Sequence, residues 1–194
     1  LRRWDGPDAD LMFDGSAGWD HVDALKVGLA LQDEGFLWYE EPMREFHLGS
    51  YAKLCNKLTI PILAAETSDG VHWNMANWID AGALDMTRVS SHYKGGFTGA
   101  IKIAHLAESF GMRAQVHGMG IENAQICAAI LNNDYHEQLV INEDQIRSLS
   151  GLGALAITDG YLNVSQGAGL GYGHDWAELD RAALRKITVT EKIT

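Results

Sequence analysis

The sequence predicts an α/β fold in which parallel β-strands alternate with α-helices. Three observations support this prediction. Short apolar runs that end in a polar residue recur along the chain, amphipathic segments with recognisable helix ends lie between them, and the polar residues recur every 20 to 27 positions. A strand, a helix and two loops need about this length, and strands that alternate with helices at such a period form a parallel sheet.

Each apolar run is almost continuously hydrophobic, which is typical of a strand covered on both faces. The six predicted strands are residues 10–14, 36–40, 61–66, 84–90, 113–117 and 135–141. A complete eight-fold βα barrel needs roughly 250 residues. The 194-residue chain therefore predicts a partial (β/α)8 TIM barrel of about six units, corresponding to strands 3 to 8, without the first strands.

The sequence indicates where two of the helices between these strands begin and end. Asp20 is placed to cap a helix over residues 21–34, before Gly35. Thr98 is expected to cap another helix that stops at Gly111. Two further helices are predicted over residues 71–82 and 120–133.

The chain is interpreted as one barrel domain over residues 1–194, in which residues 152–194 form a glycine-rich closing segment. The alternative fold is an open doubly wound sheet, which would carry a glycine-rich phosphate loop after an early strand. No such loop is present, and "GAGLGYG" comes late and opens no helix, so it is a weak dinucleotide signal.

The net charge of −11 argues against a nucleic acid or an anionic membrane as partner. The sequence has no run of 18 apolar residues and no leader, although it begins at Leu1 rather than Met, which leaves a removed leader open. Cys55 and Cys127 have no metal-ligand spacing, so we expect the reducing cytoplasm. The expected partners are a small-molecule carboxylate and further copies of the chain in a homo-oligomer.

Three carboxylates end successive predicted strands: Asp14, Glu40 and Glu66. Neighbouring strands lie about 4.8 Å apart, so these side chains can converge on one point at the active-site face of a barrel. A Mg²⁺ ion takes oxygen ligands of this kind and would remove the repulsion. Strand alternation places Glu40 on the face of Trp38 and turns Glu41 away. The alternative is that each acidic residue simply faces water.

His117 and Glu137 lie on the same predicted rim. A neutral imidazole can take a proton near neutral pH, and a glutamate can donate one if burial near other carboxylates raises its pKa. Each has a structural alternative, as a hydrogen-bonded histidine and an exposed glutamate. His92 and Lys94, in the loop after the fourth strand, could contact an anionic ligand, but solvated loop residues are the commoner case.

Several segments together resemble the mandelate racemase group of the enolase superfamily. They are "LMFDGSAGW", "WYEEP", "PILAAETSDG", "KGGFTGAIKIAHLAESFGMRAQVHG" and "AGLGYG", and the similarity runs from about residue 10 to residue 176. The resemblance implies a barrel domain that follows an N-terminal α+β capping domain. It also implies removal of the proton α to a carboxylate, with Mg²⁺ stabilising the enediolate.

The resemblance assigns a role to each matching position. It implies Asp14, Glu40 and Glu66 as metal ligands, His117 as the base and Glu137 as the residue that hydrogen-bonds the enediolate. A substrate-contacting asparagine of the family is replaced by Ser16, and the aspartate that normally orients the histidine is replaced by Ser90. The family's lysine pair would lie before Leu1.

We expect a Mg²⁺-dependent dehydratase of an acid sugar, such as an aldonate or aldarate, that forms a 2-keto-3-deoxy product. A racemase or epimerase and a lactone cycloisomerase are alternatives on the same scaffold. A different alternative, suggested by Ser90, is a catalytically silent subunit that binds a metabolite or serves in an assembly.

Overall fold

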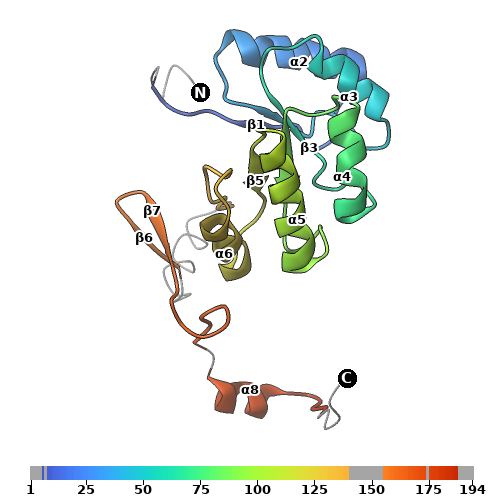
Figure 1. The fold of residues 1–194 in the computed structure, drawn as a ribbon. Helices are drawn as coiled ribbons and strands as arrows, with labels where there is room; N and C mark the ends of the chain where they lie inside the picture. The colour runs from blue at the N-terminus through green and yellow to red at the C-terminus, as the bar shows by residue number, and fades with distance from the viewer. Residues whose placement is uncertain (1–5, 7, 140–154, 174, 188–194) are drawn as a thin grey trace.

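A computed structural model describes residues 6, 8–139, 155–173 and 175–187. Within these ranges, five parallel strands form one sheet in the order β1-β2-β3-β4-β5, and helices follow the strands (Figure 1). The strands are β1 (Phe13–Asp14), β2 (Tyr39–Glu40), β3 (Ile62–Ala64), β4 (Met86–Val89) and β5 (Ala114–Val116). The helices are α2 (His21–Asp33), α3 (Leu48–Cys55), α4 (Val71–Asp80), α5 (Gly96–Ser109) and α6 (Ile121–Ala129). This arrangement confirms the predicted α/β fold.

The sixth predicted strand, residues 135–141, is not a strand in its described part. His136 forms only an isolated parallel bridge with Val116, and residues 140 and 141 lie outside the described residues. The free edge of β5 is occupied by two other contacts instead. The Ala114 amide donates to the Asn132 carbonyl at 2.8 Å, and the Val116 amide donates to the Asn133 side chain at 2.9 Å. These contacts take the donors that a longer ladder would need.

The cap of α2 is the predicted one, because the Asp20 side chain accepts hydrogen bonds from the second and third helical amides. The predicted cap of α5 is wrong. The helix begins at Gly96 with Gly95 as its cap, so Thr98 lies inside the first turn. Gly95 and Gly96 have φ angles of +77° and +70°, which a glycine adopts without steric strain. These two residues turn the chain into the helix earlier than the threonine suggested.

The two faces of the sheet carry different side chains. The face toward the helices forms the main hydrophobic core, which includes Tyr39, Ile62, Ala64 and Val89. On the other face, Trp38, Leu63 and Met86 form a smaller apolar cluster with Met12. The acidic residues of β1 and β2 lie on this second face, because Asp14 pairs with Glu40 and Glu40 with Leu63 in the strand register.

The C-terminal part begins with an antiparallel hairpin of β6 (Leu155–Thr158) and β7 (Tyr161–Val164), followed by α8 (Trp176–Ala182). Two hydrogen bonds tie it to α6. The Gln125 side chain donates to the Ser165 carbonyl at 3.0 Å, and the Tyr172 hydroxyl donates to Glu122 at 2.8 Å. Helix α8 has no buried residue and lies apart from the sheet in Figure 1. The closing role of residues 152–194 stays a prediction.

None of the described helices is long and apolar enough to cross a membrane.

Candidate metal and acid–base site

Glu40 is the last residue of strand β2 and lies at the carboxyl end of the parallel strands. This residue is only 5% exposed, and its Oε2 accepts a long hydrogen bond of 3.4 Å from the Trp38 indole. The next residue, Glu41, is also buried but is not part of the group that could hold a metal. It has a φ of +37° and accepts a hydrogen bond of 3.2 Å from the Thr67 hydroxyl. The two adjacent glutamates therefore belong to different environments.

A turn after β3 brings Glu66 onto the same face as Glu40. Ala65 is buried and has a φ of +73°, a left-handed conformation that breaks the strand alternation. The Glu45 carboxylate holds this turn, because one of its oxygens accepts from the Ala65 amide and the other accepts from the Thr67 amide at 2.8 Å. Glu45 thus positions Glu66 through the backbone on both sides of it.

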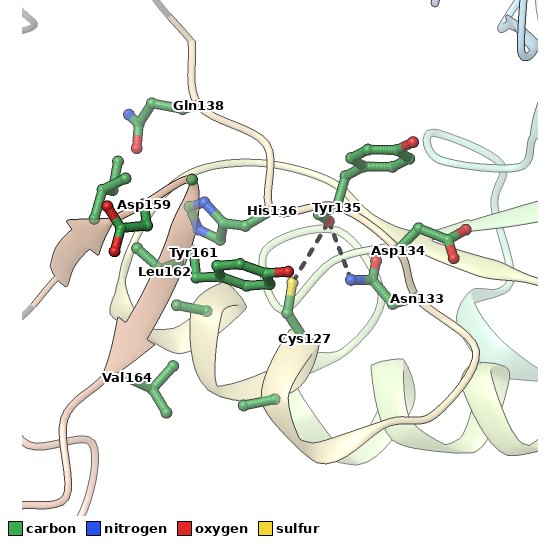
Figure 2. A pocket seen from close by; sticks show the side chains of 14 residues that line it. Cys127, Asn133, Asp134, Tyr135, His136, Gln138, Asp159, Tyr161, Leu162 and Val164 are labelled. Carbon is green, nitrogen blue, oxygen red and sulfur yellow. Dashed lines mark hydrogen bonds between the residues drawn. The ribbon is translucent and has the colours of Figure 1, made fainter. Parts of the chain in front are cut away.

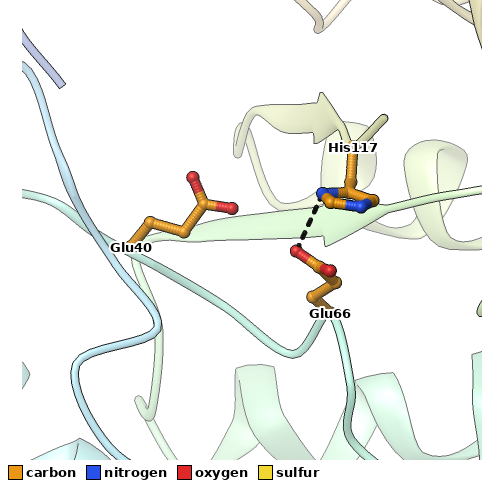
Figure 3. Close-up of side chains that lie close together, drawn as sticks. All are labelled: Glu40, Glu66 and His117. Atoms are coloured by element: carbon orange, nitrogen blue, oxygen red, sulfur yellow. Dashed lines mark ion pairs between the residues drawn. The ribbon is translucent and has the colours of Figure 1, made fainter. Parts of the chain in front are cut away.

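Glu40, Glu66 and His117 meet at one point (Figure 3). One ligand atom of each lies within 4.8 Å of the others. The Nδ1 atom of His117 lies 3.1 Å from Glu66 Oε2 and 3.3 Å from Glu137 Oε2. Burial lowers the pKa of His117, but the hydrogen bonds with Glu137 and Glu66 outweigh it and raise the pKa to about 10. The imidazole is therefore protonated at neutral pH in this arrangement.

Glu137 is an ionised acceptor, not the proton donor that its position suggested. Its Oε2 accepts from Arg88 Nη2 at 2.6 Å and from the Gly118 amide at 2.8 Å. Burial raises the pKa of Glu137, but His117, Arg88 and the Gly118 amide together lower it to about 2. The sequence made a donor role for Glu137 conditional on a raised pKa, and the cationic neighbours lower the pKa instead.

Sequence reasoning missed Arg88, which supplies a positive charge inside the carboxylate cluster. Its Nε lies 2.5 Å from Glu40 Oε1 and 3.7 Å from Glu66 Oε2, and the residue is only 5% exposed. From the sequence, these carboxylates were expected to have no cation of the protein beside them. Arg88 contradicts this expectation. An arginine inside a predicted buried strand was the available signal, since a buried guanidinium needs a counter-charge.

The other predicted site residues lie nearby with different contacts. Asp14 is exposed, and its Oδ1 accepts from the Ser16 amide at 2.6 Å, so it is not part of the group of three. Ser90 is fully buried, and its hydroxyl accepts from the His92 amide at 3.1 Å. The His117 ring is thus oriented by carboxylates and not by Ser90. The roles of Ser16 and Ser90 toward a substrate stay predictions.

Lys94 is a buried residue and not the solvated one expected of a loop. It is fully buried, and its Nζ donates to the Ser68 carbonyl at 2.9 Å and to the Ser68 hydroxyl at 3.1 Å. Burial lowers the pKa of Lys94, whereas Glu45 and Glu66 raise it. His92 lies closer to solvent and pairs with Glu122 at 3.2 Å. Lys94 therefore fixes the loop that follows Glu66.

The residues of this site fit a hard divalent cation. Glu40 Oε1 is buried and has no hydrogen-bond partner. Burial raises the pKa of Glu40 to about 7, Arg88 lowers it, and the nearby Asp14, Glu66 and Glu137 raise it further. Arg88 thus compensates the carboxylate charge only in part, and a divalent cation would add the missing positive charge. Carboxylate oxygens are the ligands that Mg²⁺ prefers.

A separate cavity of about 690 Å³ lies between α6, residues 133–138 and the β6–β7 hairpin (Figure 2). Cys127 lines it and donates a hydrogen bond to the Tyr135 carbonyl at 3.9 Å. None of the predicted catalytic or metal-binding residues lines this cavity. It is therefore not part of the candidate site.

Comparison with known proteins gives a family and a set of relatives. The sequence model of the family described as "Enolase C-terminal domain-like" matches residues 1–178. The chain is 34% identical over 130 residues to D-galactarolactone cycloisomerase of Agrobacterium fabrum, a match that covers 67% of this chain and 34% of the relative. It is 26% identical over 176 residues to arabinonate dehydratase of Saccharolobus solfataricus, covering 89% of this chain and 47% of the relative.

Solved structures of other proteins have a similar fold. D-glucarate dehydratase from Agrobacterium tumefaciens, complexed with magnesium, superposes with a TM-score of 0.86 and 36% identity, over 93% of this chain and 48% of the neighbour. A racemase from Streptomyces coelicolor A3(2) with bound magnesium has a TM-score of 0.78 and 24% identity, over 93% and 48%. The chain spans less than half the length of each of these four proteins.

Proposed function

This chain belongs to the enolase C-terminal domain-like family, and from that premise we propose that it serves the Mg²⁺-dependent removal of a proton α to a carboxylate. The proposed reaction is dehydration of an acid sugar, an aldonate or aldarate, to a 2-keto-3-deoxy product. The relatives named above as dehydratases support the substrate class. Since the chain spans under half of each relative, the activity is proposed for the protein with all its domains.

The observation that carries this proposal is the group of Glu40, Glu66 and His117. Two buried carboxylates and an imidazole present ligand atoms within 4.8 Å of one another, and Glu40 Oε1 is buried without a hydrogen bond. We assign the metal to Glu40 and Glu66, with Asp14 as the third ligand implied by the family. When bound there, Mg²⁺ would supply positive charge that stabilises the negative charge developing on the substrate carboxylate.

The protein's own groups supply the proton chemistry in this proposal. His117 exchanges the proton at the substrate carbon or donates one to the departing hydroxyl, and the raised pKa of its ring suits the second role. Glu137, ionised and bonded to the ring, holds the imidazole in place. Arg88 holds Glu137 from the opposite side through a 2.6 Å hydrogen bond. Ser16 and Ser90 remain the proposed substrate contacts.

The direct test is a screen of the full-length protein against aldonate and aldarate libraries, with detection of the 2-keto product. We expect turnover of at least one compound, which His117→Asn abolishes. The exposed His105→Asn in α5 is the matched control and retains activity. A screen with no 2-keto product, despite measured metal binding, would count against the dehydratase.

The metal assignment is tested separately by calorimetric titration of Mg²⁺. Glu40→Gln removes the charge of a proposed ligand and is expected to weaken binding, whereas the exposed Glu108→Gln in α5 leaves it unchanged. Equal affinity of wild type and Glu40→Gln would refute the assignment of Glu40.

A lactone cycloisomerase is the second candidate, because 34% identity to D-galactarolactone cycloisomerase extends over 130 residues. Conversion of a lactone without formation of a 2-keto product would identify it. A racemase or epimerase would instead exchange the α-proton with solvent deuterium without loss of water.

The proposal also covers the domain organisation, the oligomeric state and the cellular compartment. It takes residues 1–194 as an incomplete barrel with residues 152–194 as its closing segment, in a homo-oligomer. It takes the cytoplasm as the compartment, supported by Cys55 and Cys127, which are free thiols.

A further inference from the structure

Arg88 lies at the centre of the candidate metal site. Its guanidinium contacts three carboxylates that come from different parts of the sheet: Glu40 at 2.5 Å, Glu137 at 2.6 Å and Glu66 at 3.7 Å. Its Nη1 also donates to the Val116 carbonyl at 3.4 Å. A guanidinium stays charged at any pH of interest, so this buried residue is a permanent cation among the proposed ligands.

The contacts of Arg88 are of two kinds. Its Nη2 donates a hydrogen bond to Glu137 Oε2, and this charge-assisted bond anchors the guanidinium. Toward Glu40 the contact is close but is not a hydrogen bond, since both Arg88 Nε and Glu40 Oε1 are buried without a hydrogen-bond partner. The contact between these two groups is therefore an ion pair without the directional bond that Arg88 makes to Glu137.

A divalent ion and the guanidinium would both interact with the carboxylate oxygens of Glu40 and Glu66. Mg²⁺ binds carboxylate oxygen at about 2.1 Å. Glu40 and Glu66 would hold the ion, and Arg88 Nε already lies 2.5 Å and 3.7 Å from their oxygens. Two cations at such a separation repel each other in a site of low dielectric constant.

We propose that Arg88 is a resident counter-ion that competes with the divalent cation for Glu40 and thereby limits the metal affinity of the site. In the metal-free protein, Arg88 neutralises part of the carboxylate charge and holds the rim together. On metal binding, the guanidinium gives up Glu40 and keeps Glu137. This inference rests on the proposed metal site and adds a determinant of its affinity.

The test is the Mg²⁺ affinity of Arg88→Met in the full-length protein, measured by calorimetry. Methionine keeps much of the side-chain length without the charge. We expect Mg²⁺ to bind roughly tenfold more tightly or better, because like charges a few ångström apart repel by more than the energy of one decade in affinity. We also expect a lower melting temperature without metal and a larger rise in melting temperature on adding Mg²⁺ than in wild type.

Two further variants sharpen the test. Arg88→Gln removes the charge but keeps donors for Glu137, so it is expected to fold better than Arg88→Met and also to bind Mg²⁺ more tightly. Arg113→Met removes an exposed arginine that pairs with Asp134, and it should leave the Mg²⁺ affinity unchanged.

The outcomes separate this inference from the proposed function. Equal or weaker binding in both Arg88 variants, with normal binding in wild type, overturns the competition and leaves the metal site standing. Absence of binding in wild type and in both variants overturns both. Failure of both variants to fold with or without Mg²⁺ also overturns the competition, because Arg88 would then be an irreplaceable structural residue.

Discussion

Glu66 Oε2 lies 3.1 Å from His117 Nδ1, and this contact joins the turn after β3 to the residue that follows β5. The proposed metal ligand and the proposed proton carrier therefore share a hydrogen bond. A change in the charge of one residue therefore changes the electrostatic potential at the other. The same imidazole nitrogen lies 3.3 Å from Glu137, so two carboxylates share this one nitrogen of the ring.

The first prediction concerns the pH dependence of stability in the metal-free protein. The pKa of His117 is about 10 in the folded state, against about 6.5 for an unperturbed histidine. A raised pKa stabilises the folded state fully below about pH 6.5, and this stabilisation is lost as the pH rises through about 10. We expect His117→Gln to be less stable than wild type by about 2–4 kcal/mol at pH 6, allowing for screening by solvent.

The measurement is denaturant unfolding in EDTA from about pH 6 to about pH 10.5. The difference in free energy of unfolding between wild type and His117→Gln should shrink steadily over this range. His105→Gln, at an exposed position of α5, controls for the loss of an imidazole in general. A difference that stays constant with pH would contradict the pairing of His117 with the two carboxylates.

The second prediction concerns Glu45, which accepts from the amides of Ala65 and Thr67. Glu45→Ala leaves these donors without their partner, and each unsatisfied group costs about 1–3 kcal/mol. We expect Glu45→Ala to lower the free energy of unfolding by about 2–4 kcal/mol and to weaken Mg²⁺ binding, because the turn that carries Glu66 loses its support. Chemical denaturation and calorimetry check the two effects.

The exposed Glu108→Ala in α5 is the control for Glu45→Ala, and it should change stability by no more than about 0.5 kcal/mol. Normal stability of Glu45→Ala would show that Ala65 keeps its left-handed conformation without this carboxylate.

The third prediction concerns Gly99 in the first turn of α5. Replacement of a helical glycine by alanine usually stabilises a helix by up to about 1 kcal/mol. At Gly99, however, a Cβ atom would lie 1.6 Å from the Lys94 carbonyl oxygen, which is backbone and cannot move aside alone. We expect Gly99→Ala to destabilise the protein by more than about 3 kcal/mol or to prevent folding.

Gly49→Ala in α3 is the matched control, because the nearest atom to its Cβ would be the His47 side chain at 3.0 Å. Thermal unfolding of both variants gives the comparison. A melting temperature of Gly99→Ala equal to that of wild type would rule out the close approach of the Lys94 carbonyl.

The fourth prediction concerns the reactivity of the two cysteines. Burial raises the pKa of Cys55 to about 12 and the pKa of Cys127 to about 11. Since the thiolate is the reactive form, we expect iodoacetamide at pH 8 to label both slowly in the folded protein. Both should react rapidly in urea, where the thiols become accessible and their pKa returns to about 8.5. Mass spectrometry of peptides measures the rates, and rapid labelling of folded protein would contradict the burial.

The sequence predicted the parallel α/β fold because strand period and helix caps are local patterns. Asp20 caps α2 as expected, since a side chain that bonds amides two and three residues ahead needs no distant partner. The start of α5 was predicted wrongly because Gly95 and Gly96 adopt conformations that glycine permits but does not dictate.

The candidate site was predictable as a set of strand-end residues but not as a set of contacts. The strand pattern favoured Glu40 over Glu41, and Glu40 is the one that lies in the group of three. Arg88 was overlooked since its partner Glu137 lies 49 positions away along the chain. His117 and Arg88, both distant from Glu137 in the sequence, lower the pKa of Glu137, which local patterns could not indicate.

The position of the carboxylates across the sheet has a consequence for local unfolding. Among the described strands, β1 pairs only with β2, whereas β3 pairs on both sides. In hydrogen exchange, we expect the Phe13 amide to exchange well before the Tyr39 amide, which bonds the Pro61 carbonyl inside the sheet. Asp14 therefore lies on a strand with one described partner, and Glu66 follows a strand with two.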